Sequence, residues 1–130
     1  MKPVLALGLF LASTLPALAG PYDGSWDFSD AACGRQLSDG RLIIDDTILR
    51  FWESSCTLSN PVAIRDMPAA TLYDASCSGE GYEWNTRFLL SVFGAGNSSL
   101  LVMQNNDASI RFTCTPQPQM QAESPDLNSK

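Results

Sequence analysis

The sequence predicts an all-β fold, either a small antiparallel β-barrel or a sandwich of about seven strands, closed by two disulfides. Three observations lead to this prediction. Short segments alternate between apolar and polar residues with a period of two, which is typical of half-buried antiparallel strands. Clusters of Gly, Asn, Asp and Ser separate these segments at regular intervals, as turns do in barrels and sandwiches. The chain also has 130 residues and four cysteines, a composition typical of small disulfide-bonded domains.

The first 19 residues have the layout of a secretory signal peptide. Lys2 supplies the positive start, an apolar run covers residues 4–15, and Ala17-Leu18-Ala19 provides the small residues that signal peptidase requires. The apolar run is shorter than the roughly 20 residues that span a bilayer. We therefore expect residues 1–19 to be removed, and the mature protein to be periplasmic or extracellular without membrane insertion.

The strands are expected in the following order. The first alternates Tyr22, Gly24, Trp26 and Phe28 against polar neighbours. Two further strands flank a turn at Asp45-Asp46, and four more follow, the last of which places Ile110, Phe112 and Cys114 inward and Arg111 outward. The expected ranges after the first strand are 41–45, 47–53, 71–77, 84–93, 98–104 and 109–115.

Two segments fall outside this alternation. Ser59-Asn60-Pro61 is typical of the start of a short helical turn, which Met67-Pro68 would close, so residues 57–70 are expected to interrupt the sheet. Residues 116–130 lack apolar periodicity and are expected to form a disordered tail. The prediction is therefore a single disulfide-bonded β domain over residues 20–115.

The cysteines are expected to form disulfides and not a metal site, because the chain has no CxxC pair and no His. The hairpin over residues 41–53 brings its two ends together, which favours Cys33 with Cys56 and leaves Cys77 for Cys114. In a simple meander, however, the strand ends that carry Cys77 and Cys114 lie at opposite ends of the sheet. This pairing therefore requires offset strands or another strand order.

Charge narrows the choice of partner. Removal of Lys2 with the signal leaves seven Lys or Arg against 14 Asp or Glu, a net charge of −7. Nucleic acid and anionic membrane surfaces are excluded on this basis, because both attract clustered cations. A cationic protein is the partner that such a charge favours. Alternatively, the acidity serves only solubility.

The residue types that most catalytic sites need are missing. The absence of His removes Ser-His-Asp and Cys-His nucleophilic catalysis and the usual general base near neutral pH, and cysteines in disulfides supply no thiol nucleophile. We expect a protein that is not an enzyme and carries no cofactor. Catalysis by carboxyl groups remains as an alternative. The protein would then be a cell-wall glycosidase, with two of Glu53, Glu80 and Glu83 as its catalytic acids.

Aromatic and charged residues gather around two of the cysteines in the sequence. Large amphipathic rings mixed with both signs of charge suit a binding surface. In the alternative, both Trp residues lie in the core, and Glu53 pairs with Arg65 or Arg87. The candidate ligand-binding residues are Trp52, Glu53, Arg65, Glu80, Trp84 and Arg87.

Gly24-Ser25-Trp26 on the first strand resembles the G-x-W signature of the lipocalins and the wider calycin barrels. This resemblance implies that Trp26 packs across the closed end of a barrel, with Arg111 of the last strand as its candidate partner, although the alternation turns Arg111 outward. The size and the start of the chain look similar to bacterial periplasmic inhibitor barrels, which bind secreted metalloproteases or lysozymes.

Two further stretches, residues 51–56 and 77–84, look similar to small exported proteins of alphaproteobacteria. The resemblance and the charge together favour a secreted, non-catalytic binding module, an inhibitor or accessory factor for a cationic envelope protein or hydrolase. The alternative within the same fold is a carrier for a small apolar ligand inside the barrel.

Overall fold

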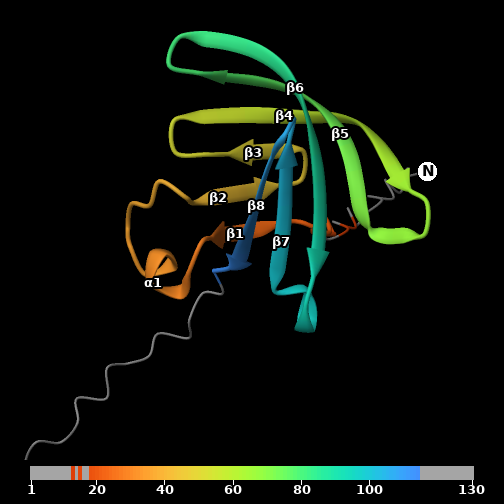
Figure 1. Ribbon diagram of the computed structural model, residues 1–130, viewed down its shortest axis with the longest axis horizontal. Coiled ribbons are helices and arrows are strands. Elements are labelled where there is room, and N and C mark those ends of the chain that lie inside the picture. Colours follow the sequence, from red (N-terminus) through yellow and green to blue (C-terminus); the bar gives the residue numbers. More distant parts are fainter. Residues whose placement is uncertain (1–12, 14, 16–17, 115–130) are drawn as a thin grey trace, which may run out of the picture.

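The chain forms a closed barrel of eight antiparallel strands in a simple meander, in which β8 closes on β1 (Figure 1). The computed structural model describes residues 13, 15 and 18–114. This confirms the all-β class and the antiparallel barrel, with eight strands in place of about seven. The elements are β1 (Gly24–Asp27), α1 (Asp30–Cys33), β2 (Leu42–Asp45), β3 (Ile48–Arg50), β4 (Ser54–Ile64), β5 (Met67–Gly79), β6 (Tyr82–Phe93), the 3₁₀ turn η1 (Ala95–Asn97), β7 (Ser99–Gln104) and β8 (Asp107–Thr113).

The additional strand arises in residues 57–70, where the expected helical turn is wrong. β4 and β5 form a long hairpin around a turn at residues 65–66. The register shifts between Ser59 and Val62, and Asn60 has a φ of 51°. This irregularity accommodates Pro61, which has no N–H to donate to a ladder. A motif that resembles a helix start is therefore a bulge in a strand.

The barrel interior is one packed apolar cluster. One end of it is closed by the start of the chain, where the Tyr22 hydroxyl donates to the Ala69 carbonyl and contacts Thr71 Oγ1, each at 2.9 Å. Trp26 Nε1–H donates to the Tyr22 carbonyl at 2.9 Å, and both rings are 4% exposed. We call this the closed end. The largest fully buried apolar side chains are Phe88, Leu42, Leu49, Leu90 and Leu100.

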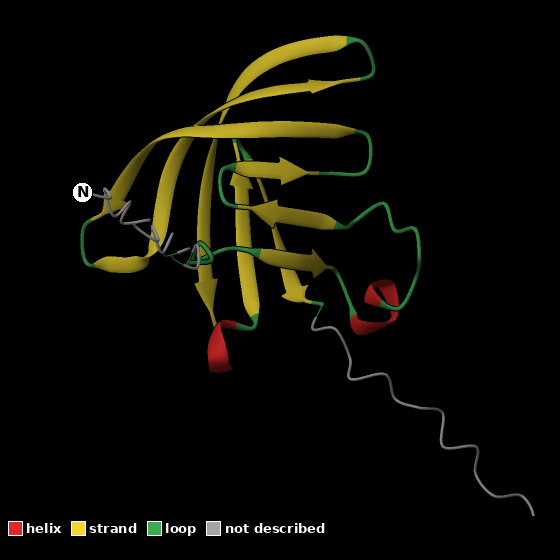
Figure 2. Cartoon of the chain, turned by 180° about the vertical axis from the view of Figure 1, so that it is seen from behind, coloured by secondary structure: helices red, strands yellow, loops and turns green. Residues whose placement is uncertain are grey.

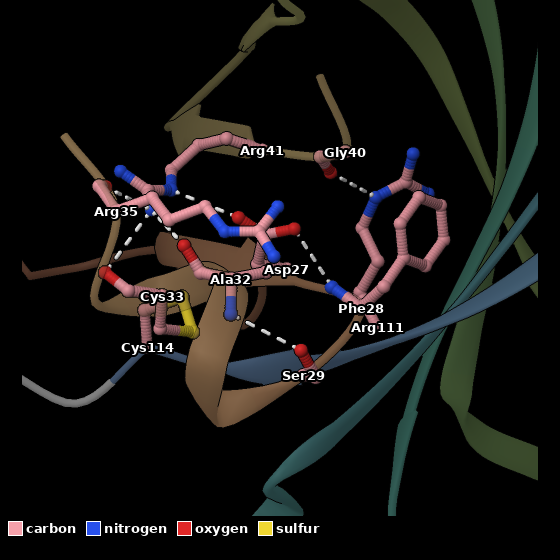
Figure 3. The surroundings of a disulfide bond; sticks show 10 residues. All are labelled: Asp27, Phe28, Ser29, Ala32, Cys33, Arg35, Gly40, Arg41, Arg111 and Cys114. Atoms are coloured by element: carbon pink, nitrogen blue, oxygen red, sulfur yellow. Dashed lines mark hydrogen bonds and ion pairs between the residues drawn. A yellow bond between two sulfur atoms is a disulfide. The ribbon is translucent and has the colours of Figure 1, made fainter. Parts of the chain in front are cut away.

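The expected disulfide pairing is wrong: the bonds are Cys33–Cys114 and Cys56–Cys77. The β4–β5 register sets Cys56 directly opposite Cys77. Because β8 pairs with β1, Cys114 lies beside the first strand, and its N–H donates to the Ser25 carbonyl at 2.7 Å. Helix α1 packs outside the barrel wall and brings Cys33 to the same place (Figures 2 and 3).

The expected facing of the last strand is also wrong. Arg111 is 8% exposed and points inward, whereas Ile110 and Phe112 are 48% and 44% exposed. The reason is the pairing with β1, which sets Thr113 opposite Trp26 and therefore puts the odd-numbered residues of β8 on the interior face. Cys114 accordingly lies on the outer face, where it meets Cys33.

The predicted tail over residues 116–130 and most of the predicted signal peptide over residues 1–19 lie outside the described residues. Within the described part of the chain, no helix is long and apolar enough to cross a membrane.

Candidate binding site at the rim of the barrel

Two turns meet at the end of the barrel opposite the closed end. The β3–β4 loop covers residues 51–53, and the β5–β6 turn consists of Glu80 and Gly81. The φ angles of these two turn residues are 51° and 81°, the signature of the type I′ turn that joins tightly paired strands. We call this loop and this turn, with the first residues of β6, the rim.

The two turns are held in close contact. Ser54 lies opposite Gly79 in the β4–β5 register, and the Phe51 N–H donates to the Ser54 carbonyl at 2.8 Å. A Cβ atom at Gly79 would stand 2.5 Å from the Glu53 carbonyl oxygen, a separation that side chains do not reach. A glycine at this position therefore lets the loop lie directly against the end of β5.

This contact brings two carboxyl groups together. The hydrogen bond between the Glu53 and Glu80 side chains, followed by the charge of Glu80, raises the pKa of Glu53 above its ordinary value. A hydrogen bond with the Trp52 side chain opposes this shift, while the charge of Asp39 adds to it. Two like charges at one place favour any cation that approaches, because a cation relieves their repulsion.

Exposed aromatic rings flank the carboxyl pair. Trp52 is 47% exposed, Trp84 37% and Tyr82 74%. Trp84 of β6 lies directly opposite Cys77 of β5, and the disulfide from Cys77 to Cys56 joins β5 to β4 at this level of the sheet. Neither Trp52 nor Trp84 is a core residue, and the interpretation that placed both inside is wrong. Large exposed rings at a turn are a feature of binding surfaces.

The structure places the two candidate arginines elsewhere. Arg87 lies on the outer face of β6, where its Nε donates to Asp74 Oδ1 at 3.0 Å. Hydrogen bonds from Asn60 and then from Arg87 lower the pKa of Asp74. Arg65 lies in the β4–β5 turn, at the closed end of the barrel. Trp52, Glu53, Glu80 and Trp84 therefore form the rim site, without Arg65 and Arg87.

Sequence reasoning missed a groove of about 770 Å³ on the outer face of the sheet. Its apolar floor is one cross-strand row, in which Leu72 pairs with Leu89 and Leu89 pairs with Met103. The row is visible only once the register of three strands is known, which is why alternation within each strand did not reveal it. The groove is lined by Ser59, Leu72, Asp74, Ala75, Ser76, Asn85, Thr86, Arg87, Leu89, Met103 and Asn105.

A buried polar cluster was also missed. Asp27 is fully buried; it accepts the Phe28 N–H at 2.8 Å and Arg41 Nε–H at 3.2 Å (Figure 3). Burial alone would raise the pKa of Asp27, but hydrogen bonds from the Phe28 N–H, Ser38 and Arg41 outweigh it and lower that pKa. Arg41 Nη2 also donates to the carbonyls of Ala32 and Cys33, at 2.8 and 3.1 Å. This cluster ties α1 to the barrel wall, and its role is structural.

Arg111 has a similar structural role inside the barrel. Its guanidinium lies 4.5 Å from the centre of the Phe28 ring, and its Nε donates to the Gly40 carbonyl at 2.9 Å. Burial lowers the pKa of Arg111, and the charge of Asp27 opposes this shift. The stacking on Phe28 and the hydrogen bond to Gly40 offset part of the cost of burying this charge.

Among the described residues, no three thiolate, carboxylate or imidazole groups gather as a metal site would require. The chain matches no protein-family model, no curated protein and no solved structure. The rim site is therefore interpreted from its own geometry.

Proposed function

We propose that this protein is a secreted, non-catalytic binding module whose rim binds a cationic segment of a partner protein. The observation that carries the proposal is the Glu53–Glu80 carboxyl pair beside the exposed ring of Trp52. A Lys or Arg side chain that enters this place relieves the repulsion within the pair and stacks on an aromatic face at the same time.

The compartment and the overall charge support the same proposal. Two disulfides form and persist only where the surroundings are oxidising. We infer that residues 1–19 direct export and that the mature chain, with a net charge of −7, works in the periplasm or outside the cell. The G-x-W start of β1 and the small barrel resemble inhibitor barrels of that compartment, which supports an inhibitor or accessory role toward a basic envelope protein or hydrolase.

The two alternative functions fit the geometry less well. A carrier needs an empty interior of several hundred cubic ångströms, whereas large side chains such as Phe88 and Leu100 pack the interior of this barrel. A glycosidase needs its two carboxyl groups about 5–10 Å apart across a cleft. Glu53 and Glu80 lie next to each other on exposed turns, not across a cleft.

A pull-down from envelope extract tests the proposal, with the oxidised protein as bait at low and then moderate salt. We expect a stoichiometric basic protein whose retention falls with salt and is lost with the double variant Glu53→Gln/Glu80→Gln. The matched control is Asp45→Asn/Asp46→Asn, which removes the same charge at the β2–β3 turn near the closed end. Equal loss with both variants, or no stoichiometric partner, would contradict binding at the rim.

A further inference from the structure

The first half of β6 is an uncovered strand edge. Residues 82–87 pair with β5 on one side, but β7 joins β6 only from Phe88 onward, which lies opposite Gln104. Among the described residues, no backbone group bonds to the other side of residues 82–87. Figure 1 shows this half of β6 as the outer arm of the β5–β6 hairpin, which extends beyond β7 and β8. A barrel that is otherwise closed therefore has a local free edge.

The turn determines which backbone groups are free. A two-residue type I′ turn makes Gly79 and Tyr82 a hydrogen-bonded pair, and such pairs alternate along the hairpin. The even-numbered residues of β6 therefore bond to β5. The N–H and C=O groups of Glu83, Asn85 and Arg87 point away from β5, in a row that is available to a further strand.

This edge has neither the proline nor the bulge that usually protect an edge strand, and its charged side chains are Glu83 and Arg87. β4 also extends beyond its neighbour β3, but there Pro61 and the register shift at Asn60 interrupt the row of donors. The β5–β6 register has no shift from Ala70 and Ser91 to Gly79 and Tyr82. The backbone edge of β6 is thus regular and carries no proline. Two side chains reach it: Gln104 Nε2 donates to Thr86 Oγ1 at 3.4 Å, and Thr86 Oγ1 donates to Asn105 Oδ1 at 3.2 Å, so an added strand would have to displace them at Thr86.

The outer groove adjoins this edge where β6 and β7 separate. Asn85 and Arg87 line it from the free edge, and Met103 and Asn105 line it from the end of β7. A strand added to β6 would continue the line of β7 beyond Gln104, and its side chains would alternate between the two faces of the sheet. Those on the outer face would enter the groove, and those on the inner face would lie beside Trp84 and Tyr82.

Charge identifies the kind of segment that fits. Glu53 and Glu80 stand at the rim end of the edge and Glu83 on the edge itself, whereas the cation Arg87 is already paired with Asp74. The local charge is therefore negative, and a cation opposite Glu83 makes a favourable cross-strand pair. A second copy of this chain would instead bring the same acidic rim against itself.

We propose that an extended, basic segment of a partner protein adds to residues 82–87 of β6 as an additional strand. The proposal rests on the proposed function and deepens it, since it specifies how the partner is held. Backbone hydrogen bonds provide the attachment, and the groove and the rim carboxylates select a segment in which basic and apolar residues alternate.

The test uses the oxidised, isotope-labelled protein and a synthetic hexapeptide of alternating Lys and Val with blocked ends. We expect the amide signals of Glu83, Asn85 and Arg87 to shift and their exchange with solvent to slow, while those of Tyr82 and Trp84 are already protected by β5. A hexapeptide of alternating Glu and Val should leave the spectrum unchanged.

The variant Asn85→Pro distinguishes a peptide that forms backbone hydrogen bonds with β6 from one that is only attracted to the carboxylates. The proline removes an N–H that has no partner among the described residues, so the fold should persist while affinity for the Lys–Val peptide falls at least tenfold. Asn85→Ala is the matched control, since it removes the same groove-lining side chain but keeps the N–H, so its affinity for the peptide should remain well above that of Asn85→Pro.

Three other results would overturn the proposal, and they can be told apart. If the peptide binds to Asn85→Pro unchanged, or shifts only the amides of residues 51–53 and 80–81, strand addition is wrong and the proposed function stands. If no amide responds to millimolar peptide, both are wrong. A dimer in light scattering that disappears with Asn85→Pro would make a second copy the occupant of the edge. Should Asn85→Pro fail to fold, slowed exchange at Glu83, Asn85 and Arg87 in the original protein decides alone.

Discussion

At the scale of single residues, Glu53 determines how the rim responds to pH. Its pKa is raised chiefly by Glu80, so the folded protein binds a proton there more readily than the unfolded chain does. The ionised pair therefore opposes folding above the raised pKa, and this cost disappears as the pH falls below about 4, the value for an unfolded Glu.

Glu53→Gln should consequently raise the midpoint of thermal unfolding at pH 7 and have little effect at pH 3.5. Glu83→Gln removes the same charge from the neighbouring strand and should give a smaller rise. The comparison is made by circular dichroism at both pH values. An equal rise for the two variants at pH 7 would mean that general charge relief, and not the carboxyl pair, accounts for the effect.

Asp27 has the opposite dependence. Its pKa is lowered in the folded protein, so its contribution to stability is fully present above about pH 4 and is lost as the pH falls through the lowered value. Asp27→Asn removes the ion pair with Arg41 at 3.2 Å and should cost about 2 kcal/mol in urea unfolding at pH 7. That cost should shrink in acid. A cost that is constant between pH 7 and pH 2.5 would show that packing, not charge, makes Asp27 important.

Four of the six candidate residues indicated by the sequence lie together at the rim, whereas the predicted inward face of β8 is wrong. Trp52, Glu53, Glu80 and Trp84 stand out because turn residues and cysteines surround them. Arg111 was placed on the wrong face because alternation separates two faces without identifying the interior, and the apolar Ile110 and Phe112 lie outside. Only the pairing of β8 with β1 decides between the faces.

At the scale of elements, the contact between the β3–β4 loop and the end of β5 can be tested at Gly79. Gly79→Ala would bring a methyl group to 2.5 Å from the Glu53 carbonyl oxygen, so the loop must move. We expect a loss of about 1–3 kcal/mol in urea unfolding and a change in Trp fluorescence. Gly81→Ala is the control: its Cβ meets no atom within 4 Å, but its φ of 81° costs about 1 kcal/mol. A smaller loss for Gly79→Ala than for Gly81→Ala would contradict tight contact.

The β4–β5 hairpin also explains the error in the disulfide pairing. A hairpin centred on residues 65–66 brings Cys56 and Cys77 opposite each other, because both lie nearly the same distance from the turn. The similar spacing of the two cysteines from residues 65–66 can be read from the sequence. It did not lead to the correct pairing because Asn60-Pro61 resembles a helix start, and no hairpin was predicted there. A bulge depends on the neighbouring strand to hold it, so local sequence could not distinguish the two.

At the scale of the whole molecule, unequal strands give the barrel its two different ends. β1, β2 and β3 have four residues or fewer, whereas β4, β5 and β6 have 11 to 13. The long strands must extend beyond their short neighbours, and on β6 this leaves an uncovered edge beside the rim. The difference in strand length therefore exposes the backbone groups of β6, and it exposes them next to the acidic and aromatic residues of the rim that select a partner.

The two disulfides constrain this barrel to different extents. Cys33–Cys114 spans 81 residues and joins α1 to the end of the last described strand, whereas Cys56–Cys77 spans 21 residues within one hairpin. Loop-closure entropy assigns about 4.5 kcal/mol to the long link and about 3.4 kcal/mol to the short one.

Replacing Cys33 and Cys114 by Ser should therefore lower the free energy of unfolding by about 1 kcal/mol more than replacing Cys56 and Cys77. Guanidinium unfolding of both double variants measures this difference. The short link lies beneath Trp84, so its loss should alter peptide binding at the β6 edge although it costs less stability. If the Cys56/Cys77 variant is the less stable of the two, the local effect of this disulfide on the β4–β5 hairpin outweighs the difference in loop-closure entropy.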